Sequence, residues 1–140
     1  GLNVKAAYFM AQMVARSMID AGVAGSIINV SSQMGHVGAQ GRTGYCASKH
    51  AIEGFTRALA WEVGEHSIRV NTLCPTFIKT SMTRPMLADT EFMDRVLSKI
   101  VLGRVGTVED IMGAVVYLAS DASLLVTGSA LLVDGGWTAN

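Results

Sequence analysis

The sequence predicts an α/β fold in which a parallel β-sheet is flanked by helices. Three short runs of mostly β-branched and apolar residues, at 26–30, 68–73 and 130–133, have the length and composition of buried parallel strands. Longer segments with apolar residues at helical spacing precede and separate these runs. Because strands and helices alternate in this way in doubly wound sheets, we expect part of such a sheet.

Composition favours one compact domain that acts on small molecules. The chain has 140 residues, of which 50% are hydrophobic, enough for a real core. Its 11 basic and 11 acidic residues are scattered, which argues against nucleic acid or an anionic membrane as a partner. No apolar run approaches the ~20 residues that cross a bilayer. Cys46 and Cys74 are expected to be free thiols, which favours a soluble, cytoplasmic protein.

The beginning of the chain indicates a fragment. Gly1 stands directly in a helical pattern, without a methionine. A doubly wound nucleotide-binding fold has two βαβαβ halves, and one βαβ unit takes about 30 residues or more. We therefore interpret residues 1–140 as a single-domain fragment that carries the C-terminal half, with an N-terminal half on the order of 100 residues absent.

The first elements place a serine at the end of a strand. Apolar residues at helical spacing predict a helix over 3–20, and Gly22 is a plausible stop. The strand at 26–30 ends at Ser31 and Ser32. Ligands bind beyond the carboxyl ends of parallel strands, so the Ser32 hydroxyl is a candidate for binding a substrate oxygen, whereas Ser31 would point to the other face.

A glycine-spaced loop follows, with glycines at 35, 38, 41 and 44. This spacing is not the G-x-G-x-x-G of phosphate loops, and the loop is too long for the tight turn that brings a helix N-terminus onto a pyrophosphate. We expect the glycines to let the loop fold over a substrate pocket.

The next helix, predicted over 44–63, begins with Tyr45 and Lys49 four residues apart. At this spacing a phenol and an ammonium share one helix face. A free phenol has a pKa of about 10, and an adjacent cation lowers it. The pair therefore predicts a tyrosine acid/base near neutral pH, and its substrate oxygen could also be bound by Ser32.

The remaining elements follow in order. The strand at 68–73 leads into an exit loop at 74–80, and residues 81–89 have little periodicity before a helix predicted over 90–101. We interpret the apolar residues of this region as a mobile cover over an apolar substrate end, with ordinary packing as the alternative: Met82, Met86, Leu87 and Phe92. A capping box at 107–110 begins a helix through Ile111, Val115 and Leu118.

The histidines do not predict a metal site. His36, His50 and His66 have no mutual spacing that suits a metal ion, and the two cysteines add none. We expect surface or loop histidines and no bound metal.

Several motifs together carry a resemblance to a known family. Their order and spacing closely resemble the short-chain dehydrogenase/reductase family of NAD(P)-dependent oxidoreductases: Asn3, Asn29-Val30-Ser31-Ser32, Tyr45-Cys46-Ala47-Ser48-Lys49, Arg69-Val70-Asn71, Cys74-Pro75 and Asp134-Gly135-Gly136. The resemblance implies the C-terminal part of a Rossmann-like fold. It also implies reversible hydride transfer between NAD or NADP and a carbonyl or secondary alcohol.

The resemblance also implies roles for individual residues. The catalytic set would be Asn3, Ser32, Tyr45 and Lys49, with Tyr45 exchanging the proton and Asn3 holding a water in a proton relay. Besides Tyr45 and Lys49, the cofactor would meet Pro75, Thr76, Ile78 and Thr80. Thr76 stands where relatives usually have glycine. Its β-carbon would narrow the space in which this loop approaches the nicotinamide. Substrate would contact Ser32, Gln33, Met34, Phe77 and Met82.

The resemblance also implies an oligomer, and two other functions remain open. In relatives the helices that begin near Asn3 and Tyr45 and the last strand pack between subunits, which implies a dimer or tetramer. One alternative keeps the fold but uses tightly held NAD for epimerisation or dehydration. Another is an inactive assembly module, because the chain lacks the glycine-rich phosphate loop and the acidic residue that binds the ribose.

Overall fold

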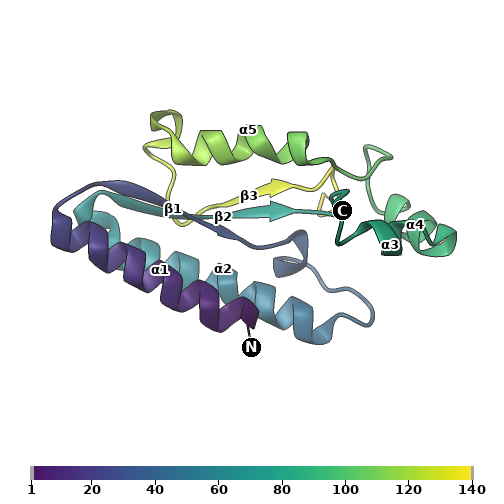
Figure 1. Ribbon diagram of the computed structural model, residues 1–140, viewed down its shortest axis with the longest axis horizontal. Coiled ribbons are helices and arrows are strands. Elements are labelled where there is room, and N and C mark those ends of the chain that lie inside the picture. The colour runs from purple at the N-terminus through teal and green to yellow at the C-terminus, as the bar shows by residue number, and fades with distance from the viewer. Residues whose placement is uncertain (1, 140) are drawn as a thin grey trace.

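Three parallel strands form the centre of the fold, which confirms the α/β prediction. The computed structural model describes residues 2–139. Strands β1 (Gly25–Val30), β2 (Ile68–Pro75) and β3 (Ala130–Val133) lie in the order β1-β2-β3, so β2 pairs on both sides (Figure 1). The register sets Val30 against Leu73 and Leu73 against Leu131. The carboxyl ends of β1 and β2 therefore reach the same edge of the sheet.

Helices cover both faces of this sheet. Helices α1 (Leu2–Ala21) and α2 (Thr43–Val63) lie on one face, and α5 (Val108–Ala119) lies on the other (Figure 1). The main core forms between α1, α2 and the sheet, and consists of small and β-branched side chains: Ala11, Ala15, Ile27, Ala60, Val63, Ile68 and Val70. Burial of these residues fixes α2, and with it the residues at its N-terminal end, against the strands.

Local signals set the ends of these helices. Helix α1 ends at Ala21, and Gly22 follows with φ +64°, a left-handed conformation that glycine adopts without strain. At the start of α5 the Asp110 carboxylate accepts a hydrogen bond from the Thr107 N–H at 2.8 Å, which confirms the capping box. Short 3-10 turns occupy Gln33–Gly35, Gly64–His66 and Asp121–Ser123.

The region after β2 differs from the sequence prediction. It contains a short helix α3 (Arg84–Leu87) and α4 (Thr90–Leu97), so the helix predicted over 90–101 ends early. The chain turns because Ile100 is buried in a second core cluster with Val96, Val105 and Trp137, and Gly103 adopts φ +68°.

The four apolar residues of the predicted substrate cover lie in two different surroundings. Leu87 and Phe92 pack against the second core cluster, and the Phe92 ring lies edge-on to Phe77 with centroids 5.6 Å apart. Met82 and Met86 remain available to a substrate, and both line the cavity described below. Leu87 and Phe92 thus take the ordinary packing role, and a substrate cover formed by Met82 and Met86 stays a prediction.

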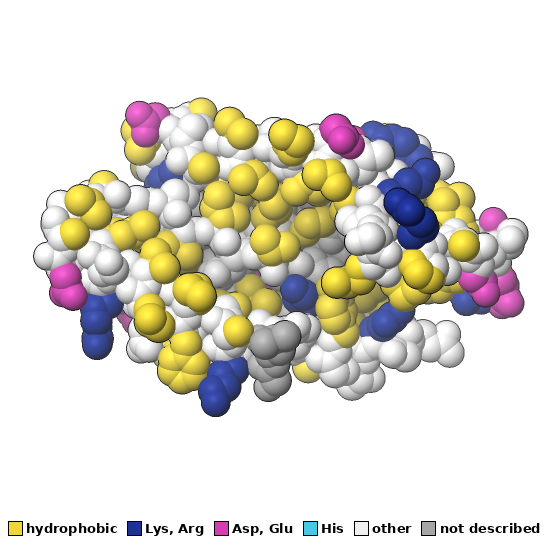
Figure 2. All heavy atoms as spheres, in the orientation of Figure 1, with side chains coloured by type: hydrophobic (Ala, Val, Ile, Leu, Met, Phe, Trp, Pro, Cys, Tyr) yellow, Lys and Arg dark blue, Asp and Glu magenta, His cyan; other side chains and the backbone are white. Residues whose placement is uncertain are grey.

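Apolar side chains also lie on the surface. Figure 2 shows hydrophobic atoms gathered over α5 and across the space between α5 and α1. The exposed large side chains include those of α1 and α5: Tyr8, Phe9, Met10, Met13, Met112, Val115 and Val116. None of the described helices combines the length and the apolar character that a membrane crossing requires.

Candidate active site

A cavity of about 460 Å³ opens at the carboxyl ends of β1 and β2. Segments that are distant in sequence line it together: Val30, Ser31, Ser32, Gln33, Met34, Arg42, Tyr45, Lys49, Pro75, Thr76, Phe77, Ile78, Thr80, Met82, Thr83 and Met86. All the site residues predicted from the sequence except Asn3 are in this lining. Asn3 is exposed in the first turn of α1 and does not line the cavity, so its proposed part in a water relay stays a prediction.

Tyr45 and Lys49 lie side by side at the N-terminal end of α2. The Lys49 Nζ is 5.6 Å from the centroid of the Tyr45 ring, as the four-residue spacing predicts. Lys49 also donates a hydrogen bond of 3.1 Å to the Val30 carbonyl oxygen at the end of β1. Tyr45 is 39% exposed, so its phenol is accessible from the cavity. The lysine thereby ties the helix to the strand that carries the serine.

The environment of Lys49 disfavours its charge. Partial burial of the ammonium lowers the pKa of Lys49 below the ordinary lysine value, and the nearby Cys74 and Glu53 side chains oppose this effect. Burial is the larger influence. Lys49 is therefore easier to deprotonate here than a surface lysine.

Ser32 is held in place by its own backbone neighbours. As the N-cap of the 3-10 turn Gln33–Gly35, its Oγ accepts a hydrogen bond from the Met34 N–H at 3.1 Å. The hydroxyl donates to Gln33 Oε1 at 2.6 Å. A substrate oxygen could accept this hydrogen bond only by replacing the Gln33 amide oxygen. Gln33 thus holds the serine hydroxyl in the absence of a substrate.

Close packing explains why residue 35, one of the four spaced glycines, has no side chain. A Cβ at this position would lie 2.9 Å from Ser31 Oγ, 3.1 Å from Glu53 Cγ and 3.2 Å from the Lys49 carbonyl oxygen. The turn that carries Ser32 can therefore approach α2 closely only because residue 35 lacks a side chain. A Cβ at Gly38, Gly41 or Gly44 would meet no atom within 4 Å, so the folding of this loop over a substrate pocket stays a prediction.

The exit loop of β2 forms the opposite wall. The Thr76 N–H donates to the Val133 carbonyl oxygen at 3.2 Å, which extends the pairing of β2 with β3. Among the described non-glycine residues only Ser67 has a positive φ, so Thr76 takes the place of the usual glycine without a left-handed backbone. Its Oγ1 is buried and has no hydrogen-bond partner among the residues described.

Threonine hydroxyls fix the end of this loop. The Thr83 hydroxyl donates to the Ile78 carbonyl oxygen at 2.6 Å and accepts from the Thr80 N–H at 2.9 Å. Thr83 and Arg42 also line the cavity, and neither was predicted from the sequence to belong to the site. Two signals could have identified them: the Thr80/Thr83 spacing, and the position of Arg42 one helical turn before Tyr45.

Two of the three histidines, His50 and His66, lie in ordinary surroundings. His50 Nδ1 is 2.9 Å from the Cys46 carbonyl oxygen within α2, and His66 lies beside Glu65 at the surface. Cys46 and Cys74 are both free, as predicted.

Comparisons with known proteins agree with these observations. A family model described as enoyl-(acyl carrier protein) reductase matches residues 1–138. The 2-dehydro-3-deoxy-D-gluconate 5-dehydrogenase of Dickeya dadantii is 42% identical over 138 residues, which cover 99% of this chain and 54% of that protein.

Solved structures show the same likeness. A 4-hydroxyisoleucine dehydrogenase complexed with NADH has a TM-score of 0.95 and 34% identity, with 99% of this chain and 57% of that chain covered. A gluconate 5-dehydrogenase from Burkholderia cenocepacia, in complex with NADP and tartrate, has a TM-score of 0.93 and 34% identity, with 99% and 54% covered. The chain thus spans about half the length of these relatives. The family model, the relatives and the ordered motifs together establish that the chain belongs to the short-chain dehydrogenase/reductase family.

Proposed function

We propose that the protein transfers a hydride reversibly between NAD or NADP and a carbonyl or secondary alcohol, with Tyr45 as the general acid/base. The observation that carries this proposal is the convergence of Ser32, Tyr45 and Lys49 on one cavity, from a strand end and a helix start. Relatives with bound NADH and NADP support the choice of cofactor.

The residues of the cavity fit a nicotinamide nucleotide. Pro75, Thr76, Ile78 and Thr80 lie along one wall of the cavity. The buried and unpartnered Thr76 Oγ1 is a polar atom that a carboxamide or ribose hydroxyl could satisfy. When bound, the nicotinamide would donate or accept the hydride. Lys49, whose Nζ is already near the Tyr45 ring, would hold a ribose hydroxyl.

The proton would move through Tyr45. In reduction its phenol would give the proton to the carbonyl oxygen, and in oxidation it would take the proton back. The Ser32 hydroxyl would turn from Gln33 Oε1 to the same oxygen and stabilise its developing negative charge. The Lys49 ammonium beside the ring would favour the phenolate that forms when Tyr45 gives up its proton. Asn3 would connect Lys49 to solvent through a water, as predicted from the resemblance.

The lining also indicates a class of substrate. Arg42 supplies a guanidinium to a wall that is otherwise largely apolar, with Met34, Phe77, Met82 and Met86. A guanidinium pairs well with a carboxylate. We therefore favour a hydroxy or oxo carboxylic acid as substrate, which agrees with the acids in the names of the Dickeya and Burkholderia relatives.

The experiment uses the full-length natural protein. Oxidation of NADH or NADPH is followed by absorbance with a panel of oxo acids and with matched neutral ketones. We expect turnover with an oxo acid, and we expect Arg42→Gln to raise KM for the acid but not for the ketone. Arg104→Gln is a suitable control, because Arg104 pairs with Asp110 away from this cavity. If no carbonyl compound changes the absorbance, the protein is not a simple dehydrogenase, and the epimerase or dehydratase alternative gains support.

Assembly and location are part of the proposal. The exposed apolar side chains of α1 and α5 support a homo-oligomer, either a dimer or a tetramer. The free thiols of Cys46 and Cys74 support a reducing compartment such as the cytoplasm.

Calorimetry of the 140-residue chain with NADH and NADPH separates the active enzyme from the assembly module, since tight binding would contradict the view that half of the cofactor site is missing.

A further inference from the structure

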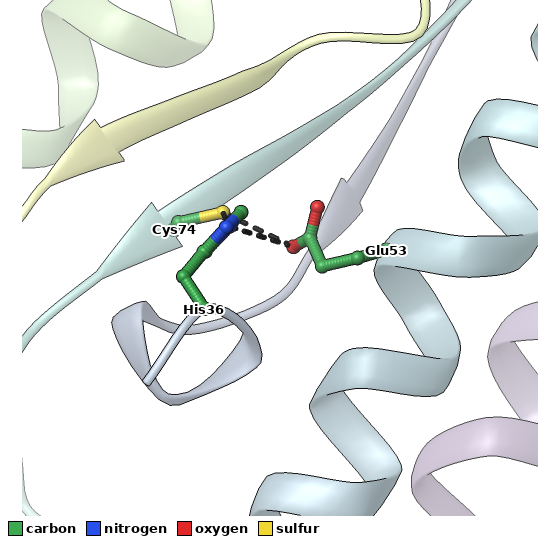
Figure 3. A group of neighbouring side chains, drawn as sticks. All are labelled: His36, Glu53 and Cys74. Carbon is green, nitrogen blue, oxygen red and sulfur yellow. Dashed lines mark hydrogen bonds and ion pairs between the residues drawn. The ribbon is translucent and has the colours of Figure 1, made fainter. Parts of the chain in front are cut away.

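Three side chains that can bind a metal ion meet between α2, β2 and the loop that follows Ser32. Figure 3 shows His36 from the loop after the 3-10 turn, Glu53 from α2 and Cys74 from β2 pointing toward one another. Cys74 Sγ is 3.3 Å from Glu53 Oε1 and 3.5 Å from His36 Nε2, and His36 Nε2 is 3.5 Å from Glu53 Oε1. These atoms form a nearly equilateral triangle.

The triangle has the size that a tetrahedral ion requires. Zinc bonds of about 2.0–2.2 Å to nitrogen and oxygen and about 2.3 Å to sulfur, at tetrahedral angles, separate the ligand atoms by about 3.3–3.6 Å. All three observed separations fall in this range. An ion could therefore bind with little movement of the protein.

The protein holds the two buried ligands firmly. Glu53 is 3% exposed and Cys74 is fully buried, whereas the His36 side chain is 26% exposed and offers a path from solvent. The second carboxylate oxygen, Glu53 Oε2, accepts a hydrogen bond of 2.9 Å from the Thr72 hydroxyl. This leaves Oε1 directed at the cluster, so the carboxylate is oriented before any ion arrives.

A fourth polar atom lies beside the triangle. Ser31 is 4% exposed, and its hydroxyl makes no hydrogen bond of regular geometry to the described residues. It lies close enough to Cys74 to lower the pKa of that thiol, and it lies on the side of the turn where Gly35 approaches Glu53. Buried hydroxyls are rarely left without a partner, so this atom is suited to complete a coordination shell.

We propose that His36, Glu53 and Cys74, with Ser31 at the fourth position, bind one divalent transition metal ion of the zinc type. A thiolate, an imidazole and a carboxylate form a donor set that zinc accepts, whereas magnesium and calcium prefer oxygen ligands. The ion displaces the thiol proton: a Cys74 sulfur–metal bond forms, the S–H bond breaks, and one proton goes to solvent. The proposal does not depend on the oxidoreductase activity.

The test follows metal binding by spectroscopy. The full-length protein is stripped with a chelator and titrated with Co²⁺, which gives thiolate charge-transfer absorption, and then with Zn²⁺ as competitor. We expect one equivalent of Co²⁺ and an intense band that Zn²⁺ removes. Cys74→Ser should abolish the charge-transfer band, and His36→Gln should weaken binding at least tenfold.

Matched variants make the result decisive. Cys46→Ser and His50→Gln change the other cysteine and a histidine of the same region, and both should retain the wild-type titration. His36→Gln changes a partly exposed loop residue, so its fold is secure even if Cys74→Ser unfolds. The proposal is overturned if the wild-type protein shows no thiolate band with Co²⁺, or if the signal is lost with Cys46 or His50 rather than with Cys74 and His36.

Discussion

Substitution of Gly35 by alanine probes how the turn that carries Ser32 packs on α2. The new Cβ would meet Ser31 Oγ at 2.9 Å, Glu53 Cγ at 3.1 Å and the Lys49 carbonyl oxygen at 3.2 Å. The last of these belongs to the backbone of α2 and cannot rotate away. The turn that carries Ser32 must therefore move outward by a few tenths of an ångström.

Two effects should follow in the full-length enzyme. Overfilling a packed position costs about 1–3 kcal/mol of folding free energy. For a domain of about 150–250 residues this corresponds to a fall in Tm of about 2–12 °C. Because a displacement of 1 Å can cost about 10²-fold in rate, the smaller shift of Ser32 should lower kcat/KM by about tenfold.

Thermal unfolding and steady-state kinetics measure both effects, with Gly38→Ala as the control. A Cβ at Gly38 would meet no atom within 4 Å. Gly38 is the next of the spaced glycines after Gly35. We expect Gly38→Ala to match the wild-type protein. Equal Tm and equal kcat/KM for the two variants would refute the claim that close approach at residue 35 positions Ser32.

Three further predictions concern stability. Lys49→Met should raise Tm at neutral pH, because burial lowers the pKa of Lys49 in the folded state; the gain should shrink in melts as pH rises toward about 10.4, where the lysine charge is lost in both states. Gly135→Ala should cost about 1–3 kcal/mol in denaturant titrations, through its φ of +61° and a Cβ 2.7 Å from Ile100, and more than Gly22→Ala, which has only the strained φ. Hydrogen bonds from Arg104 hold the pKa of Asp110 well below its usual range, so Asp110→Asn should lower Tm at pH 7, and the loss should disappear in melts at strongly acidic pH, where the native carboxyl is also protonated.

Local patterns account for most of the predicted fold. The short apolar and β-branched runs identified β1, β2 and β3, Gly22 marked the end of α1, and the residues at 107–110 marked the start of α5. Each is a property of a few neighbouring residues. The end of α4 could not be predicted in this way, because it depends on the burial of Ile100 beside Trp137, a contact between distant parts of the chain.

The same distinction applies to the site. Order and spacing brought Ser32, Tyr45 and Lys49 together correctly, since a strand end and a helix start fix their positions. The cluster of His36, Glu53 and Cys74 has no local spacing at all, because its members come from a loop, a helix and a strand. Only the parallel pairing and the close approach at Gly35 bring them together.

The most direct test of the account compares Tyr45→Phe with Tyr117→Phe in the full-length enzyme. Both remove one phenolic hydroxyl from a similarly exposed ring, but only Tyr45 lines the cavity. Turnover and cofactor affinity are measured separately. We predict that Tyr45→Phe loses nearly all turnover with little change in cofactor affinity, while Tyr117→Phe retains both. Turnover that survives in Tyr45→Phe would contradict the role of this tyrosine in the proton step.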